Sequence, residues 1–397
     1  MFRHLPPTAT PLPLATFSQA MHPPADAVTR FRHTFADATG ATACYTASSG
    51  RTALFLLLAA LVDTPDSAAR DEVIIPAYTC PSLVRVVLDA GLTPRLVDID
   101  PATFAFVPAA LNAALSTNTL AVILVHPFGI PLPVTPVLTA AEKVGARVIE
   151  DAAQSMGARL DGRPVGTAGD FGLYSLGPGK PLSAGGGGIL TVNPRAAAFV
   201  PALNRTWQQL PPPSSAGNWT AAGRLAAFTM AFEPHGWWLA TRAGAQRAGD
   251  DEKNWGFALT ELTAAQATIA LEQLPRLDAY NRVRRGHAER IRSAIMETAH
   301  FRDVHVAPES DPFYLRFPVI FRQPQLCAAV HAALHGNGIG AGRMYKATLA
   351  SLFPQLAGDF PGAEQVAAGL LTLPTHHFLT SGDITRMATI IRAAVSG

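Results

Sequence analysis

This chain has few lysine side chains, so few residues could supply a primary amine for covalent catalysis. Four of its 31 lysine and arginine residues are lysines: Lys143, Lys180, Lys253 and Lys346. Schiff-base chemistry needs an amine rather than a guanidinium, so it must use one of these four. Lys180 is the best placed, because FGLYSLGPGKPLSAGGGGIL puts it in a Gly, Pro and Ser loop between two apolar strands. Desolvation there would lower its pKa and leave a neutral nucleophile; the alternative is a surface-turn lysine.

Asp151 is the second candidate, since it follows the apolar start of VIEDAAQS and ends a strand that we expect to be buried. An unpaired carboxylate in such a place costs several kcal/mol, so it needs a cationic partner. The pyridinium nitrogen of pyridoxal phosphate (PLP) is one such partner, and the pair would keep the ring protonated as an electron sink. The alternative is a helix N-cap, which Asp followed by AAQ also suits.

A third candidate is an anion site at the start of the apolar helix in TASSGRTALFLLLAAL. The backbone amides of Ser49, Gly50 and Arg51 would point out of that helix start, where free N–H groups and the helix dipole favour a phosphate. Ser175, five residues before Lys180, could add a hydroxyl. The alternative is an ordinary serine N-cap.

These candidates need a scaffold, and the first half of the chain predicts an α/β fold. Short apolar runs alternate with helical stretches: VIIP at 73–76, PRLVDID at 94–100, AVILVHP at 121–127 and RVIEDAA at 147–153. This βαβ rhythm predicts a mostly parallel sheet with helices on both faces, and ligands at the carboxyl ends of its strands. His126, Asp151 and Lys180 each follow a strand, although a lone histidine such as His126 is more often structural.

The second half predicts a smaller lobe, so we expect a large domain over 1–255 and a small α+β domain over 256–397. An insertion covers about 207–255. A long helical pattern starts at Leu259, followed by strand-like FYLRFPVIF and a terminal helix after Thr380. The apolar segment 225–240 inside the insertion is expected to pack in the core or in a dimer. The alternatives are a lid over the substrate, a surface for a partner, and a membrane contact, which we do not expect.

Composition excludes several classes of protein. With 48% hydrophobic and 15% charged residues over 397 positions, the chain should fold rather than stay disordered. A net charge of +2 without a basic block argues against nucleic acid and for a small-molecule ligand. The cysteines, Cys44, Cys80 and Cys327, lack the spacing of a disulfide framework or zinc site. We expect a cytoplasmic protein, since no export signal or membrane span is evident.

At this point the chain resembles the DegT/StrS family of PLP-dependent sugar aminotransferases, within the fold-type I superfamily. The resemblance spans nearly the whole sequence and is most specific in VIEDAAQSMGARLDGRPVGTAGDFG and YSLGPGKPLSAGGGG, with looser matches in LEQLPRLD and LLTLPTHHFLTSGDI. It implies that Lys180 carries the Schiff base, that Asp151 pairs with the pyridinium, and that Gln154 lies beside the ring. It also implies a phosphate site made by Gly50, Arg51 and Ser175.

Several positions depart from the family pattern. Arg51 stands where members usually have Thr, and Cys80 where an aromatic stacks on the ring. Tyr78 is expected to point the other way if this stretch is extended, so packing is its simpler role. The family's Asn-x-Arg is missing, with Gly256 or Leu259 at the Asn position. Met344 takes the place of a His before Tyr345.

The resemblance implies a two-stage amino transfer. An amino donor such as glutamate would displace Lys180 and leave its amino group on the cofactor, and a keto-sugar, most often nucleotide-linked, would then accept it. His126, Tyr78 and Tyr345 are the candidate substrate contacts, and a homodimer is expected because fold-type I sites are shared between subunits. The alternatives are a PLP dehydratase or lyase, a transaminase of a non-sugar ketone, and a scaffold that has lost catalysis.

Overall fold

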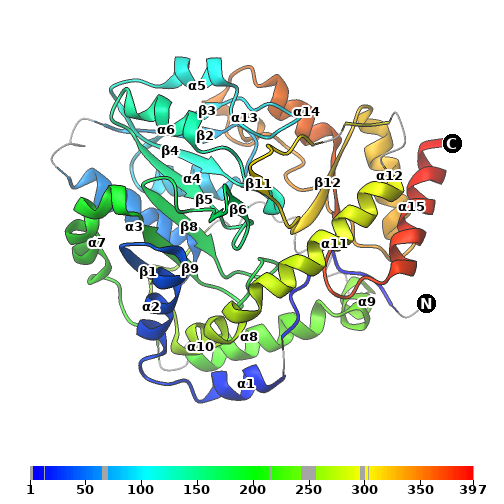
Figure 1. The fold of residues 1–397 in the computed structure, drawn as a ribbon, viewed down its shortest axis with the longest axis horizontal. Coiled ribbons are helices and arrows are strands. Elements are labelled where there is room, and N and C mark those ends of the chain that lie inside the picture. Colours follow the sequence, from blue (N-terminus) through cyan, green and yellow to red (C-terminus); the bar gives the residue numbers. More distant parts are fainter. Residues whose placement is uncertain are drawn as a thin grey trace.

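A seven-stranded sheet forms the centre of the larger part of the molecule (Figure 1). The computed structural model describes residues 3–12, 14–64, 70–214, 217–242, 256–295, 300–302 and 304–396. In spatial order the strands are β1 (Ala43–Ala47), β9 (Gly188–Val192), β8 (Phe171–Ser175), β5 (Arg147–Asp151), β4 (Thr119–Val125), β2 (Glu72–Pro76) and β3 (Thr93–Val97). The five strands from β8 to β3 are parallel, and β9 is antiparallel to both of its neighbours. The predicted mostly parallel sheet is confirmed.

Three of the predicted strands end earlier than expected, each for a local reason. β3 ends at Val97 because the Asp98 carboxylate accepts backbone N–H groups of α14 (Pro361–Gly369). β4 ends before Pro127, which has no N–H to continue a ladder. β5 ends at Asp151, whose side chain turns back to the N–H of Ala153. These endings place polar residues at the carboxyl edge of the sheet.

Helices cover both faces of this sheet. Alternate strand residues point to opposite sides, so Val73 and Ile75 pack with α3 and α4, whereas Ile74 packs in the cluster that holds Val137 of α6. The helices around the sheet are α2 (Ala27–Thr39), α3 (Gly50–Val62), α4 (Ser82–Asp89), α5 (Pro108–Ala114), α6 (Thr135–Glu142) and α7 (Val200–Trp207). The sheet is therefore buried on both faces, as its near-continuous apolar strands require.

A smaller unit follows, built on a second sheet of order β10 (Phe301–Arg302), β12 (Arg316–Phe321) and β13 (Leu370–Pro374). Its helices are α11 (Leu277–Ile295), α12 (Pro324–Gly336), α14 and α15 (Ser381–Ser396). The short helix α13 (Leu349–Leu352) packs with the larger unit, because Leu349 lies in the same apolar cluster as α3 and α4. Figure 1 shows α11, α12 and α15 beside β12. A third, short sheet joins β11 (Ser310–Asp311), β6 (Arg159–Leu160) and β7 (Arg163–Pro164) across the two units.

The predicted long helix after Leu259 is two helices. Thr263 caps α10 (Ala264–Gln273) through a reciprocal pair of bonds with Gln266, so the helix begins at 264. Pro275 lies in a 3-10 turn at 274–276 that separates α10 from α11, as expected for a residue without an N–H. α10 packs on α2, on α8 and on α1 (Leu14–Met21). The division at 255–256 stays a prediction, with residue 255 outside the described ranges.

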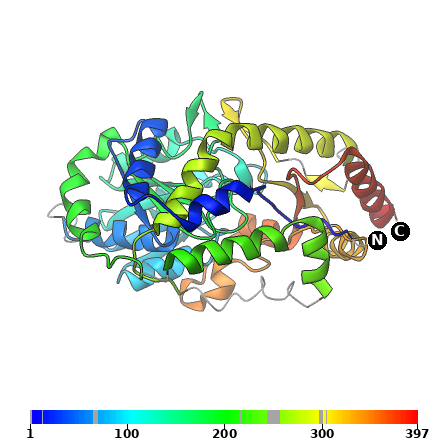
Figure 2. The same cartoon turned by 90° about the horizontal axis from the view of Figure 1, so that it is seen from below.

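The predicted insertion contains α8 (Gly217–Ala231) and α9 (Pro234–Arg242), and Figure 2 shows both along one side of the molecule. Pro234 begins α9, so the apolar segment 225–240 is split between two helices. Met230 and Leu239 are 72% and 63% exposed. Residues 215–216 and 243–255 of the insertion, which include Lys253, lie outside the described residues. Among the described residues, no helix combines the length and apolarity needed to cross a membrane.

Candidate active site

Lys180 lies in the loop that joins β8 to β9, as predicted. The preceding Gly179 has φ +72°, and a Cβ there would lie 2.7 Å from Cγ2 of Thr8, so the turn suits glycine. The Lys180 N–H donates to Gly177 O at 3.3 Å, and the Thr10 hydroxyl donates to Lys180 O at 3.0 Å. Burial lowers the pKa of the Lys180 amine, while the Asp151 carboxylate acts in the opposite direction. The amine is thus biased towards its neutral, nucleophilic form.

Asp151 is buried at the end of β5. Its Oδ1 accepts the Ala153 N–H at 2.9 Å, and among the described residues it forms no salt bridge. Burial raises its pKa above the ordinary aspartate value, although the Ala153 N–H and the charge of Lys180 act in the opposite direction. Residues 153–157 form turns, so no helix starts here for Asp151 to cap. It is a buried carboxylate that lacks a full set of partners.

His126 has a different environment. Its side chain is 0% exposed; Nε2 is 3.0 Å from Glu150 Oε2, and Nδ1 accepts the Leu132 N–H at 2.9 Å. The acceptor role of Nδ1 leaves Nε2 to carry the proton towards Glu150. Both ring nitrogens are therefore bonded within the protein, so this geometry does not support the expected substrate contact. The structural role that we expected more often for a lone histidine fits these bonds.

The start of α3 lies beside the end of β8. Ser49 is the N-cap of α3, and its Oγ accepts the Thr52 N–H at 3.1 Å. A Cβ on Gly50 would lie 3.6 Å from Cβ of Ser175, and Ser175 Oγ accepts the Gly177 N–H at 3.2 Å. The cap alternative and the anion alternative are compatible, because a capping side chain satisfies only part of the first-turn N–H groups.

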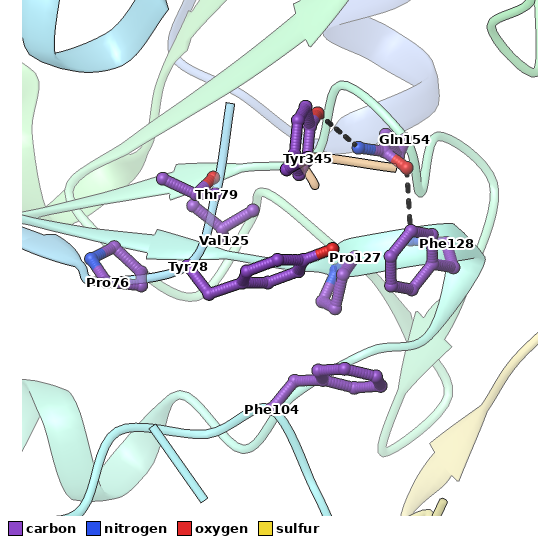
Figure 3. A pocket seen from close by; sticks show the side chains of 9 residues that line it. All are labelled: Pro76, Tyr78, Thr79, Phe104, Val125, Pro127, Phe128, Gln154 and Tyr345. Carbon is purple, nitrogen blue, oxygen red and sulfur yellow. Dashed lines mark hydrogen bonds between the residues drawn. The ribbon is translucent and has the colours of Figure 1, made fainter. Parts of the chain in front are cut away.

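A cavity lies between the ends of β2 and β4 and the loop after β5, with an empty volume of about 330 Å³ that includes open solvent. Figure 3 shows the nine side chains that line it. They are Pro76, Tyr78, Thr79, Phe104, Val125, Pro127, Phe128, Gln154 and Tyr345. Gln154 Oε1 accepts the Phe128 N–H, and its Nε2 donates to the Tyr345 hydroxyl, both at 3.3 Å. The two bonds fix the amide of Gln154 at the edge of this cavity.

Tyr78 lies in this site, although an extended chain would have turned it away. Residues 77–79 form bends rather than a strand, which changes the alternation of side chains. Its ring packs edge-on against Tyr345, with centroids 5.7 Å apart, and its hydroxyl donates to Met344 O at 2.5 Å. Cys80 Sγ is 3.0 Å from Ser82 Oγ, and its side chain lies near enough to Lys180 and Tyr345 to interact with both. The structure thus brings both residues to the same site.

Two polar residues were missed in the sequence analysis. Glu150 is buried beside Asp151, and Arg316 begins β12, where its charge acts on Lys180. The signals were available: Glu150 is an acidic residue inside an apolar strand, and Arg316 is a basic residue inside FYLRFPVIF. Each is a charge in a place that burial makes costly.

The comparison with family models identifies the class. Residues 17–206 and 220–392 match the DegT/DnrJ/EryC1/StrS aminotransferase family, and the chain belongs to it. A UDP-N-acetyl-3-dehydro-α-D-glucosamine 3-aminotransferase of Acidithiobacillus ferrooxidans is 32% identical, over 88% of this chain and 84% of that protein. An L-glutamine:2-deoxy-scyllo-inosose aminotransferase of Streptomyces kanamyceticus is 30% identical, over 68% of this chain and 56% of its own length.

Among solved structures, Spr1654 of Streptococcus pneumoniae, named as a sugar aminotransferase and solved in its PLP form, superimposes with a TM-score of 0.80. It is 18% identical, and the match covers 99% of each chain, so the likeness concerns the fold. Together these comparisons confirm four predictions: the family, the fold-type I architecture, the aminotransferase class and PLP as the cofactor.

Proposed function

We propose that this aminotransferase moves an amino group from glutamate to a keto-sugar carried by a nucleotide. The named relatives, which are sugar and aminocyclitol aminotransferases, confirm the coarser prediction of amino transfer to a keto-sugar. The observation that carries the proposal is the pair of the half-buried Lys180 and the buried Asp151, whose carboxylate has no cation within ion-pair distance among the described residues.

The residues present fit PLP. When bound, PLP supplies an aldehyde for an amine and a protonated ring that stores electrons. Lys180 offers the amine. Asp151 offers a buried carboxylate that holds a proton at the ring nitrogen, and this would relieve the cost of its burial. Gly50, Arg51 and Ser175 offer backbone and side-chain donors for the phosphate, and Gln154 offers an amide near the phenolic oxygen.

Lys180 also performs the proton transfer in this proposal. Once an amino acid has taken its place on the cofactor, the neutral Nζ of Lys180 would take the proton from the donor's α-carbon and return it to the cofactor carbon that had been the aldehyde carbon. The depressed pKa makes Nζ available to accept that proton, and the Asp151 carboxylate stabilises the charged form that results. The hydrogen bonds of the backbone C=O and N–H of Lys180 restrict the motion of this loop while the side chain changes its role.

The cofactor ring needs a side chain against its face, and Cys80 and Tyr78 are the two candidates for that role. Cys80 occupies the family's stacking position, and Tyr78 and Tyr345 lie edge-on to each other in the adjacent cavity. We assign Cys80 to the cofactor and the two tyrosines to the substrate. The missing Asn-x-Arg leaves Arg51 as the added charge for the phosphate.

The test is the visible spectrum of purified protein with added PLP, before and after L-glutamate. We expect a yellow band in wild type and in Lys143→Ala, whose lysine is exposed, and bleaching of that band by glutamate. Lys180→Ala should lack the band. A band that ignores every amino donor would instead favour a dehydratase or lyase, and the absence of any Lys180-dependent band would favour a scaffold without catalysis.

The class of amino acceptor can be identified by adding two kinds of ketone, in separate assays, to the glutamate-treated protein. A nucleotide-linked keto-sugar should restore the yellow band, and a free keto-inositol should restore it only at much higher concentration. The reverse order would move the acceptor to the aminocyclitol class of the second relative, and a response to neither would favour a non-sugar ketone. We also propose that the protein is cytoplasmic and that it forms a homodimer. Sedimentation of the PLP-loaded protein would test the dimer.

A further inference from the structure

Arg316 is a positive charge that faces the site from the smaller unit. It begins β12, opposite Pro374 of β13, and it is half-buried. A Cβ built on Gly179, the residue before Lys180, would lie 3.8 Å from Nη2 of Arg316, and one on Gly342 would lie 3.6 Å from Nη1. The guanidinium therefore lies between the Lys180 loop and the segment that leads to Tyr345.

The guanidinium of Arg316 has few hydrogen-bond acceptors around it in the part of the chain that the structure describes. Among the described residues, its one hydrogen bond runs from Nη1 to Sδ of Met344 at 2.6 Å, and no carboxylate lies within ion-pair distance. A thioether is a weak acceptor, and an arginine keeps its charge at any physiological pH. Burial lowers the pKa of Arg316, and the side chain of Tyr345 acts in the opposite direction. The charge is therefore left for a ligand.

Arg284 shows what a structural arginine looks like in the same fold. It is 0% exposed, yet its Nη1 donates to Asn281 Oδ1 at 2.8 Å and its Nη2 to Thr10 Oγ1 at 3.0 Å. It also reaches the carbonyl of Pro181, directly after Lys180, at 3.4 Å. Arg284 uses its donors to hold the Lys180 loop, whereas Arg316 keeps most of its donors unused.

We propose that Arg316 binds the α-carboxylate of the amino donor. A guanidinium matches a carboxylate with two parallel hydrogen bonds, and the amino group of a donor held there would lie close to Lys180, which it must replace. This inference rests on the proposed function and deepens it by assigning the donor's anion. The cofactor phosphate is assigned elsewhere, to the start of α3 beside Ser175.

The first experiment measures binding without amino transfer. Glutarate, which has the two carboxylates of glutamate and no amine, is titrated by calorimetry into PLP-loaded wild type, Arg316→Gln, Arg316→Lys and Arg322→Gln. Arg322 is exposed one residue beyond the other end of β12, so its variant is the matched control. We expect Arg316→Gln to weaken binding about 10- to 100-fold, Arg316→Lys to fall between, and the control to match wild type.

The second experiment measures the half-saturating concentration for a change in the visible band. In Arg316→Gln it should rise for L-glutamate and stay unchanged for propylamine, an amine without a carboxylate. Equal glutarate affinity and equal glutamate response in Arg316→Gln and wild type would overturn the proposal. A loss confined to the nucleotide-linked acceptor would overturn it too, by assigning the charge to the acceptor's phosphates.

The two proposals fail in different ways. Glutarate binding that depends on Arg316, in a protein whose band glutamate does not bleach, would support the carboxylate site and contradict amino transfer. Bleaching by glutamate that survives unchanged in Arg316→Gln would support amino transfer and contradict the role of Arg316. If the Gln variant does not fold, Arg316→Lys decides, because it keeps the charge and loses the two-pronged geometry.

Discussion

Glu150 and Asp151 are adjacent acidic residues at the end of one strand, and they have opposite environments. The Glu150 carboxylate accepts the N–H groups of Gly166 at 2.9 Å, Ala168 at 2.7 Å and Gly169 at 2.6 Å, and it also bonds His126. Within the described ranges, Asp151 accepts a single backbone N–H, that of Ala153. Because successive strand residues point to opposite faces, the first carboxylate enters the protein interior and the second faces the ligand side.

The pKa values of the two groups follow these environments. Burial alone would raise the pKa of Glu150, but the bonds from His126, Gly169 and Gly166 bring it below the ordinary value. Burial raises the pKa of Asp151, and its few partners do not restore it. A buried charge with its own partners stabilises the fold, whereas a buried charge without them costs stability and marks a place for a ligand.

The largest effect should come from Asp151→Asn. The amide keeps the shape and removes the charge that holds a proton on the cofactor ring, so we expect the rate of amino transfer to fall about 10²- to 10³-fold. The protein without cofactor should be equally or more stable, since an uncompensated buried carboxylate has been removed. Turnover and thermal melting are the measurements. A variant that is less stable but retains its turnover would contradict the ligand-facing role of Asp151, because it would then behave as we expect of Glu150.

The matched change on the other face is Glu150→Gln. The new amide nitrogen would meet N–H donors of the 166–169 turn, so we expect the free energy of unfolding to drop by about 2–4 kcal/mol. Denaturant melts of the cofactor-free protein measure the loss. Turnover per folded molecule should change far less than in Asp151→Asn, and a larger loss of turnover than of stability would move Glu150 into the chemistry.

A smaller effect is expected from Ser175→Ala, which tests the phosphate end of the site. Removal of this hydroxyl should weaken PLP about 10-fold, because it deletes one charge-assisted bond. Pyridoxal, which lacks the phosphate, is the control ligand and should bind both proteins equally. Fluorescence titration gives both affinities, and an equal loss for the two ligands would place Ser175 away from the phosphate.

The last prediction concerns the pH dependence of stability and His376, a residue that burial keeps neutral. Its Nε2 donates to Pro6 O at 2.8 Å, and burial lowers its pKa to about 3. In the unfolded chain the imidazole of His376 takes up a second proton near pH 6.5. The stability that comes from burying the neutral ring is therefore complete above that pH and is lost as the pH falls, at ~1.4 kcal/mol per pH unit. Denaturant melts of His376→Gln between pH 6.5 and 4.5 should show a shallower decline, and parallel slopes would contradict this account.

Much of this arrangement could be predicted from the sequence because it depends on local patterns. The apolar runs predicted the parallel strands, and the sparse lysines together with the Gly-rich loop predicted the position of Lys180 between β8 and β9. The position of Asp151 at the end of a buried strand could be predicted for the same reason, since a charge at the end of an apolar strand needs only the strand to be recognised. Its role stays a prediction.

The features that local patterns could not predict depend on contacts between distant segments. The roles of His126 and Glu150 are set by the 166–169 turn, and no local pattern predicts that this turn donates three N–H groups. The direction of the Tyr78 side chain depends on the bend at 77–79, which the alternation of residues along a strand does not predict. Arg316 approaches Lys180 from 136 positions further along the chain, where it looks like one more charge in a strand.

The most direct test of the central claim is to identify the lysine that carries the cofactor. PLP-loaded protein is reduced with borohydride, digested and mapped by mass spectrometry. The account predicts the phosphopyridoxyl label on Lys180 and none of comparable yield on Lys143, Lys253 or Lys346. A label on any of those three, or a Lys180 that stays unlabelled while PLP is bound, would contradict the assignment of this loop as the active site.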